Sequence, residues 1–403
     1  MNAEINTIIE RIAKDCILHQ DRYAEKINFS NGCSGIAVFF ASLYKVTGDD
    51  TYREFSESLI AHSIDVINDS EHAMLGTLFN GISGIAWSML HLRETGVIDF
   101  EDDLLEDFDE IITSFLQEPF ERNEYDHLHG YLGIGFYVLE RNMPDAEKTV
   151  RMIVDKLYAM NESAVSDEMY WHDYWGGRAM TDPNGKIWNL GLAHGIPAIV
   201  YFFCKCYRNN LCKTEAENAI TKTLNWFAKQ RNDASTCSSF PISITTHREY
   251  SRESRLGWCY GDFGALFAFM HGGKTLENPL WIETAKEIAL KIATRKVEDK
   301  SMVRDACLCH GAAGIAFMLT QIENELGLTE LETSKQYWLD YVIENYKANN
   351  QEFLTYYKRD DSNQENYVKE YGILTGISGV GLALLGTIHP EMNEWSSPFL
   401  IKL

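Results

Sequence analysis

The chain has little proline, no long apolar run and few basic residues for its size. Only 8 of its 403 residues are proline, which favours long helices because proline interrupts helix interiors. It has no run of about 18 or more apolar residues, so we expect no transmembrane helix. Lysine and arginine number 36 against 59 aspartates and glutamates, which gives a net charge of −23. This charge excludes nonspecific nucleic-acid binding and attraction to anionic membranes, which both need a basic face.

The cysteines form no C-x-x-C pair, so the sequence does not indicate a zinc ribbon. They number 9, an odd count, and are spread irregularly. The first residues carry neither a basic stretch nor an apolar stretch, and we expect no signal peptide. These observations predict a cytoplasmic protein with reduced thiols, some of which are candidate metal ligands.

A glycine motif, G-x-x-G, recurs seven times along the chain. The fourth copy is irregular, because Ala198 stands where the other copies have their second glycine. Each motif is followed by a segment that is apolar on nearly all sides, which is typical of a buried helix. The first glycines of the copies are Gly32, Gly81, Gly130, Gly195, Gly261, Gly311 and Gly376.

An amphipathic segment precedes every copy of the motif. In the first, Ile5, Ile8, Ile9 and Ile12 form an apolar stripe at helical spacing, while the other faces are charged. An open array of such repeats would need polar capping repeats at both ends, but the first and last repeats resemble the middle ones. We therefore predict a single all-α domain over residues 1–403, an α/α toroid (double-layered barrel) of seven inner and seven outer helices.

Three longer intervals between motifs hold polar, aromatic-rich inserts. They cover residues 163–190, 233–256 and 353–373. The first contains the turn sequence Asp182-Pro-Asn-Gly, which favours a tight reversal of the chain. We expect short hairpins or lids in these inserts.

The repeat turns carry the candidate metal ligands. Cys259 precedes the fifth motif, and Cys309 and His310 precede the sixth. Because these repeats are neighbours in sequence, we expect their turns to lie side by side. Two thiolates and an imidazole suit zinc, and three protein ligands leave a fourth position open, as in catalytic sites. The alternative is that both cysteines simply belong to the core, where cysteine is common.

Three short sequences together resemble those of the lanthionine synthetase C-like family, the lantibiotic cyclases. They are Gly257-Trp-Cys-Tyr-Gly, Cys309-His-Gly and Asn189-Leu-Gly-Leu-Ala-His-Gly. The resemblance spans the whole chain, since that family also has seven G-x-x-G repeats in an α/α toroid. It implies a zinc ion bound by Cys259, Cys309 and His310. Two positions depart from the family pattern: Phe263 replaces a proline, and Ala198 replaces the second glycine.

The resemblance also implies roles for four other residues. His194 corresponds to a histidine implicated in proton transfer, and Asp126 to an aspartate that is also needed. Arg255 and Tyr260 flank the first zinc cysteine and match residues of the family. Without the resemblance, Asp126 reads as a helix cap, His194 as a satisfied buried histidine and Arg255 as a surface arginine. We also expect Asp262 to cap the fifth apolar helix.

The implied activity is that of a zinc-dependent cyclase. It would add peptide cysteine thiols to dehydroalanine or dehydrobutyrine and form lanthionine or methyllanthionine rings. The implied substrate is a dehydrated precursor peptide, and the implied partners are a separate dehydratase and an exporter. Three alternatives remain: a family member that adds or binds glutathione or another thiol without ring formation, a zinc prenyltransferase-like enzyme that activates a thiol, and a scaffold without activity.

Overall fold

The computed structural model describes residues 1–69, 74–117, 125–143, 145–173, 186–246, 253–358 and 365–402. Over these ranges, fourteen α-helices alternate between an amphipathic and an apolar type, as the repeats predict. The amphipathic helices are α1 (Asn2–Leu18), α3 (Asp50–Asp69), α5 (Asp103–Gln117), α7 (Ala146–Met160), α9 (Lys213–Ala228), α11 (Pro279–Ala293) and α13 (Glu332–Ala348). The apolar helices are α2 (Cys33–Thr47), α4 (Ile82–Glu94), α6 (Tyr131–Arg141), α8 (Ile196–Arg208), α10 (Asp262–Thr275), α12 (Ala312–Leu326) and α14 (Ile377–Ile388).

The chain divides into two compact units. The first comprises Met1–Ile112, Val303–Gln321 and Glu332–Trp395, and the second comprises Thr113–Met302, Ile322–Leu331 and Ser396–Leu403. The prediction of one domain over the whole chain stays a prediction.

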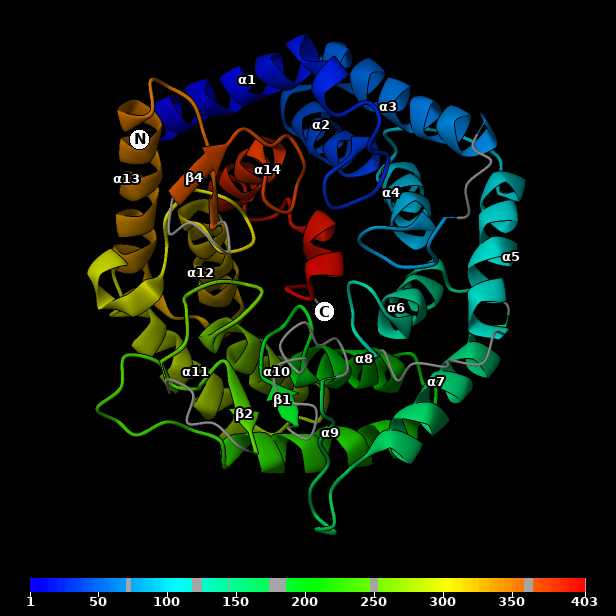
Figure 1. Cartoon of the computed structure of the whole chain (residues 1–403), viewed down its shortest axis with the longest axis vertical. Helices are drawn as coiled ribbons and strands as arrows, with labels where there is room; N and C mark the ends of the chain where they lie inside the picture. The colour runs from blue at the N-terminus through cyan, green and yellow to red at the C-terminus, as the bar shows by residue number, and fades with distance from the viewer. Residues whose placement is uncertain are drawn as a thin grey trace. The chain divides into compact units, whose positions relative to one another are not determined.

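In the first unit, the apolar helix α2 packs against α3, α4 and α14, and α1 packs against α14 (Figure 1). The buried stripe of α1 is the one that the sequence predicts, since Ile5, Ile8, Ile9 and Ile12 are all at most 3% exposed. Strands β3 (Thr355–Lys358) and β4 (Glu365–Val368) form an antiparallel pair with Thr355 opposite Val368. This pair confirms the hairpin that we expect in the third insert.

In the second unit, α8 packs against α6, α9 and α10, while α7 packs against α6 and α11 against α10. The first two inserts contribute one strand each. Strand β1 (Ile187–Asn189) pairs antiparallel with β2 (Ser243–Thr245), so the described parts of these two inserts are joined to each other. The predicted turn at Asp182 lies outside the described residues.

Each apolar helix begins directly after the first glycine of its motif. The second glycine is required by a close approach of the preceding loop: a Cβ at Gly379 would lie 1.8 Å from the carbonyl oxygen of Ile373. Gly261 has a φ of +118°, a conformation open to glycine and costly for other residues, and a Cβ there would lie 1.9 Å from the Arg255 carbonyl oxygen. The preceding loop approaches the first turn of the helix in the same way at Gly35, Gly84 and Gly314, whereas at Gly264 the nearest backbone is that of Leu190.

Both departures from the family pattern are accommodated in the core. Ala198 is 2% exposed, and its helix still begins after Gly195, with Pro197 in the first turn where a proline is tolerated. Phe263 is fully buried, and its ring stacks on that of Phe267. Neither replacement displaces the start of its helix.

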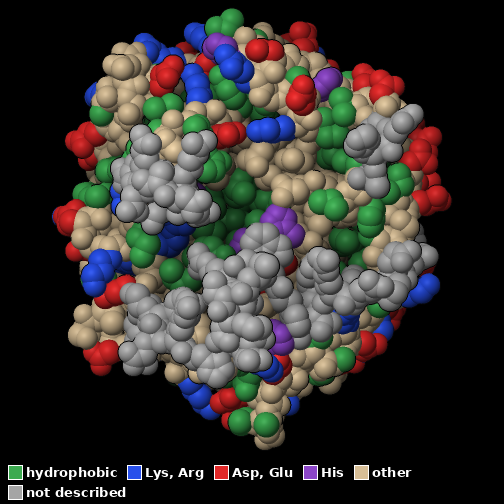
Figure 2. Space-filling model, viewed as in Figure 1, with side chains coloured by type: hydrophobic (Ala, Val, Ile, Leu, Met, Phe, Trp, Pro, Cys, Tyr) green, Lys and Arg blue, Asp and Glu red, His purple; other side chains and the backbone are tan. Residues whose placement is uncertain are grey.

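Charge is carried on the outside of the amphipathic helices. On the face that Figure 2 shows, acidic side chains are interspersed with basic ones over these helices rather than gathered in one patch. Among the described helices, none is both long and apolar enough to cross a membrane.

Candidate functional site

A buried carboxylate and an imidazole form the most distinctive polar pair of the second unit. Asp126 precedes α6, and its Oδ1 accepts hydrogen bonds from the backbone N–H groups of Leu128 (2.7 Å) and His129 (2.8 Å). Its Oδ2 lies 2.5 Å from Nδ1 of His194, which precedes α8. The side chains of Asp126 and His194 are 2% and 11% exposed. Asp126 thus fixes the turn before α6 and holds a histidine from another repeat.

The interpretation of Asp126 as a helix cap is not the arrangement found. The N-cap of α6 is Gly130, and no side chain caps that helix end. The carboxylate instead bonds to two N–H groups of the preceding turn and to the imidazole, so its position serves His194 as well as the local backbone.

Each member of the pair favours the charged form of the other. Burial lowers the pKa of His194, but the hydrogen bond and the negative charge of Asp126 outweigh it, so the net shift is upward. Burial raises the pKa of Asp126, but the hydrogen bond and positive charge of His194 outweigh this, and the net shift is downward. The imidazolium form of His194 therefore persists to a higher pH than that of an ordinary histidine.

Two rings flank His194. The centroid of the His129 ring lies 5.7 Å away in a stacked arrangement, and that of Tyr260 lies 5.9 Å away at a tilt. Because Nδ1 faces Asp126, Nε2 is the nitrogen through which His194 would pass a proton to a substrate. Tyr260 is half-buried and lies beside this ring.

Cys259 lies on the turn that leads into α10, next to a cation. Its side chain is 7% exposed, and Arg255 Nη1 lies 3.8 Å from its Sγ. A guanidinium so close to sulfur favours the thiolate, which is the form that binds metal. Arg255 is half-buried and in contact with the candidate ligand, so the reading as a plain surface arginine is wrong.

Asp262 does not cap α10, contrary to our expectation. The N-cap is Gly261, with no side-chain cap. The fully buried Asp262 carboxylate accepts hydrogen bonds from the backbone of Ser239 (2.8 Å) and Phe240 (2.9 Å), and it lies 3.6 Å from the buried guanidinium of Arg295. Asp262 therefore fastens the second insert to the start of α10, which holds the turn that carries Cys259.

In the first unit, Cys309 and His310 follow each other on the turn before α12. Cys309 is 6% exposed, and its backbone N–H donates to the Leu374 carbonyl at 3.0 Å. His310 Nε2 lies 3.8 Å from Oδ2 of Asp305. Asp305, Cys307 and His310 each offer a ligand atom within 4.8 Å of the others, so this turn contains a second possible metal-binding group.

Asp305 is a residue that sequence reasoning missed. It is 1% exposed, and its Oδ1 accepts from the Cys307 N–H (3.0 Å) while its Oδ2 accepts from the Tyr356 N–H on β3 (2.9 Å). This carboxylate fastens the hairpin to the turn, and it lies beside the candidate ligand His310, with Oδ2 3.8 Å from Nε2. The only signal in the sequence that could have identified Asp305 is its position as an acidic residue just before Cys307-Leu-Cys309-His310.

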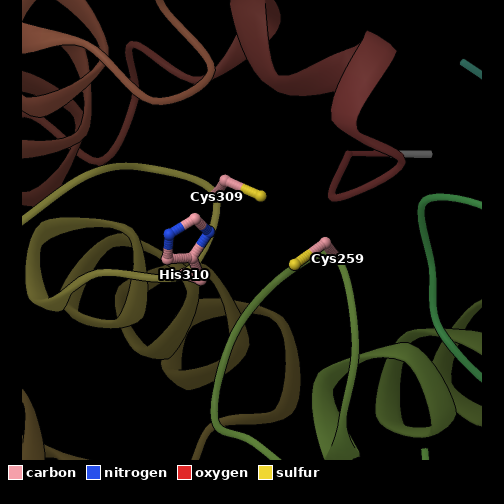
Figure 3. A group of neighbouring side chains, drawn as sticks. All are labelled: Cys259, Cys309 and His310. Atoms are coloured by element: carbon pink, nitrogen blue, oxygen red, sulfur yellow. The ribbon is translucent and has the colours of Figure 1, made fainter. Parts of the chain in front are cut away.

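Figure 3 draws the three candidate ligands. Cys309 and His310 come from the turn before α12 in the first unit, and Cys259 comes from the turn before α10 in the second. The second unit also holds Asp126, His194, Arg255 and Tyr260. Every site residue that the sequence suggests is therefore on a repeat turn or close before one.

Comparison with known proteins finds a family, a relative in sequence and a similar solved structure. A family model described as lanthionine synthetase C-like protein matches residues 23–400. The nisin biosynthesis protein NisC of Lactococcus lactis subsp. lactis is 24% identical over 391 residues, which cover 89% of this chain and 85% of NisC. A solved structure of nisin cyclase is 20% identical, with a TM-score of 0.78 over 98% of both chains. The likeness to that structure confirms the all-α toroid fold.

Proposed function

Since the chain belongs to the lanthionine synthetase C-like family, we propose that it is a zinc-dependent lanthipeptide cyclase. Its reaction would join cysteine thiols of a dehydrated peptide to dehydroalanine or dehydrobutyrine residues of the same peptide. The observation that carries the proposal is the buried pair of Asp126 and His194, with a raised pKa on the imidazole. Such a pair keeps the imidazole protonated to a higher pH than an ordinary histidine, and the addition of a thiol to an alkene requires an acid.

The donor atoms of Cys259, Cys309 and His310 fit zinc. Thiolates and imidazole are ligands that zinc prefers, and Arg255 beside the Cys259 sulfur favours the thiolate. Asp305 holds a carboxylate toward the imidazole of His310. A bound zinc ion would lower the pKa of an entering substrate thiol and so supply a thiolate at neutral pH.

The remaining steps fall to the side chains of this chain. When sulfur adds to the β-carbon of the dehydro residue, negative charge develops on the adjacent amide oxygen, and a cation such as Arg255 or the His194 imidazolium can stabilise it. His194 Nε2 then donates a proton to the α-carbon. The proton lost from the thiol balances the proton gained by carbon, so the reaction is a net addition. Asp126 holds the imidazole ring, and its charge and hydrogen bond favour the protonated form.

A dehydrated peptide with free cysteines tests the proposal. Cyclisation leaves the mass unchanged and removes free thiols, so thiol alkylation followed by mass spectrometry counts the rings formed. We expect thiols to disappear much faster with the protein than without it. Equal rates with and without the protein would indicate a scaffold without activity. Addition of glutathione to the peptide in trans would indicate a thiol-adding enzyme. Transfer of a prenyl group from a prenyl diphosphate would indicate a prenyltransferase-like enzyme.

The same proposal implies partners. A cyclase needs a separate dehydratase that prepares the peptide and an exporter that removes the product, and it would act in the cytoplasm. Co-purification of a dehydratase with the wild-type chain, lost when the precursor peptide is absent, would support such an assembly.

Asp126→Asn is expected to shift the pH profile of cyclisation. Asparagine removes the negative charge that raises the pKa of His194, so the imidazolium should lose its proton at lower pH. The basic limb of kcat against pH should therefore move to lower pH, while the wild type keeps its activity to higher pH. An unchanged basic limb in a folded variant would contradict the assignment of His194 as the acid.

A further inference from the structure

The segment Ser396–Lys402 belongs to the second unit, and four of its backbone carbonyls are bonded to side chains (Figure 1, end marked C). His127 Nε2 lies 2.8 Å from the Pro398 oxygen, and Trp258 Nε1 donates to the Phe399 oxygen at 2.6 Å. His271 Nε2 lies 3.0 Å from the Leu400 oxygen, and the Tyr201 hydroxyl donates to the Lys402 oxygen at 2.6 Å. The donors come from four separate places in the chain.

The four donors are buried, and the two histidines among them have one tautomer and one protonation state. All four are at most 2% exposed. Because a carbonyl only accepts hydrogen bonds, both histidines must carry their proton on Nε2. Burial lowers the pKa of His127 to about 4 and that of His271 to about 3, so both rings are neutral at ordinary pH. These four contacts therefore do not change with pH in the physiological range.

The four donors differ in their distance from the candidate site. His127 directly follows Asp126, and Trp258 directly precedes Cys259. His271 and Tyr201 lie within α10 and α8, away from the turns at the start of these helices. The segment is thus anchored to two helices and also bonded to two turns that carry site residues.

We propose that Ser396–Lys402 is a positioning segment, which sets the turns of Asp126 and Cys259 through His127 and Trp258. The inference rests on the proposed function for its effect on the reaction. The segment continues the 3-10 helix Glu394–Phe399 and is largely buried, so its carbonyls need hydrogen-bond partners. Four of them are satisfied by side chains, and two of these side chains, those of His127 and Trp258, directly adjoin site residues in the sequence. The ring of Trp258 also packs edge-on against Phe399, with centroids 5.3 Å apart, which adds an apolar contact to the hydrogen bond.

Paired variants separate positioning from stability. His127→Phe and Trp258→Phe each remove one donor at a site turn, whereas His271→Phe and Tyr201→Phe each remove one donor at an anchoring helix. We expect all four to lower the urea midpoint. Only the first two should lower kcat, by about 10- to 100-fold, because displacement of reacting groups by about 1 Å has effects of this size. KM should change little, and His127→Gln, which keeps a donor, should recover most of the rate.

A second measurement does not depend on cyclisation. The pKa of the His194 imidazole, followed by NMR of histidine-labelled protein, should fall in His127→Phe because the Asp126 turn loosens, and should stay at the wild-type value in His271→Phe. If kcat falls equally in all four variants, or if His127→Phe leaves both kcat and the His194 pKa unchanged, the segment only stabilises the fold. If the wild type does not cyclise peptides, the proposed function fails, while the NMR comparison still decides whether the segment positions the Asp126 turn.

Discussion

Cys309→Ala and Cys259→Ala are each expected to abolish zinc binding and cyclisation together. Each substitution removes one of the two proposed sulfur ligands, and the two remaining donors should hold zinc far more weakly, since structural and catalytic sites use at least three protein ligands. We expect about one zinc ion per chain in the wild type and almost none in either variant. Elemental analysis of the folded protein, beside the cobalt(II)–thiolate absorption of the exchanged protein, measures this directly.

Two further cysteine variants make the zinc experiment decisive. Cys237→Ala is the matched control, because Cys237 lies in the insert before α10 and is not among the candidate ligands. Cys307→Ala tests the second group, formed by Asp305, Cys307 and His310. If Cys307→Ala loses the metal while Cys259→Ala retains it, the metal belongs to the turn before α12 alone, and the proposed open site is wrong.

The helices could be predicted from sequence because their signals are local. Each G-x-x-G copy marks the start of an apolar helix, and the stripe of Ile5, Ile8, Ile9 and Ile12 marks the buried face of α1. The glycines are required by the close approach of the loop that precedes them, as at Gly379. The motifs mark seven helices and the amphipathic stripes mark the other seven, so both kinds of helix could be predicted from local patterns.

The contacts of the site could not be predicted in the same way, because they join residues far apart in the sequence. His127 bonds to Pro398 across 271 positions, and Asp126 bonds to His194 across 68. The resemblance suggested Asp126 and His194 as residues but not the hydrogen bond between them. Asp262 is instructive, because its position at the start of α10 suggests a cap, whereas its carboxylate binds the backbone of Ser239 and Phe240.

His194→Asn is expected to slow cyclisation by about 10²- to 10⁴-fold, the usual contribution of a general acid, and to leave zinc bound. The asparagine amide can still donate to Asp126 Oδ2, so the carboxylate is not left buried without a partner and the fold should persist. Thiol alkylation under single-turnover conditions gives the rate, and elemental analysis of the same preparation gives the zinc content.

The combination of these two results identifies what His194 does. Loss of rate with retained zinc assigns it to proton transfer, whereas loss of both would make it a residue that supports the metal. His62→Asn is the control, since His62 is a half-buried histidine of α3 whose Nε2 lies 2.9 Å from the Ala24 carbonyl oxygen, away from the candidate residues in sequence. A wild-type rate in His194→Asn would show that His194 is not the general acid. The pKa of His194, which Asp126 raises, would then affect only the stability of the protein. In that case the contribution of the pair to stability would be lost as pH rises through the raised pKa of His194 and as it falls through the lowered pKa of Asp126, while cyclisation would not change with either group.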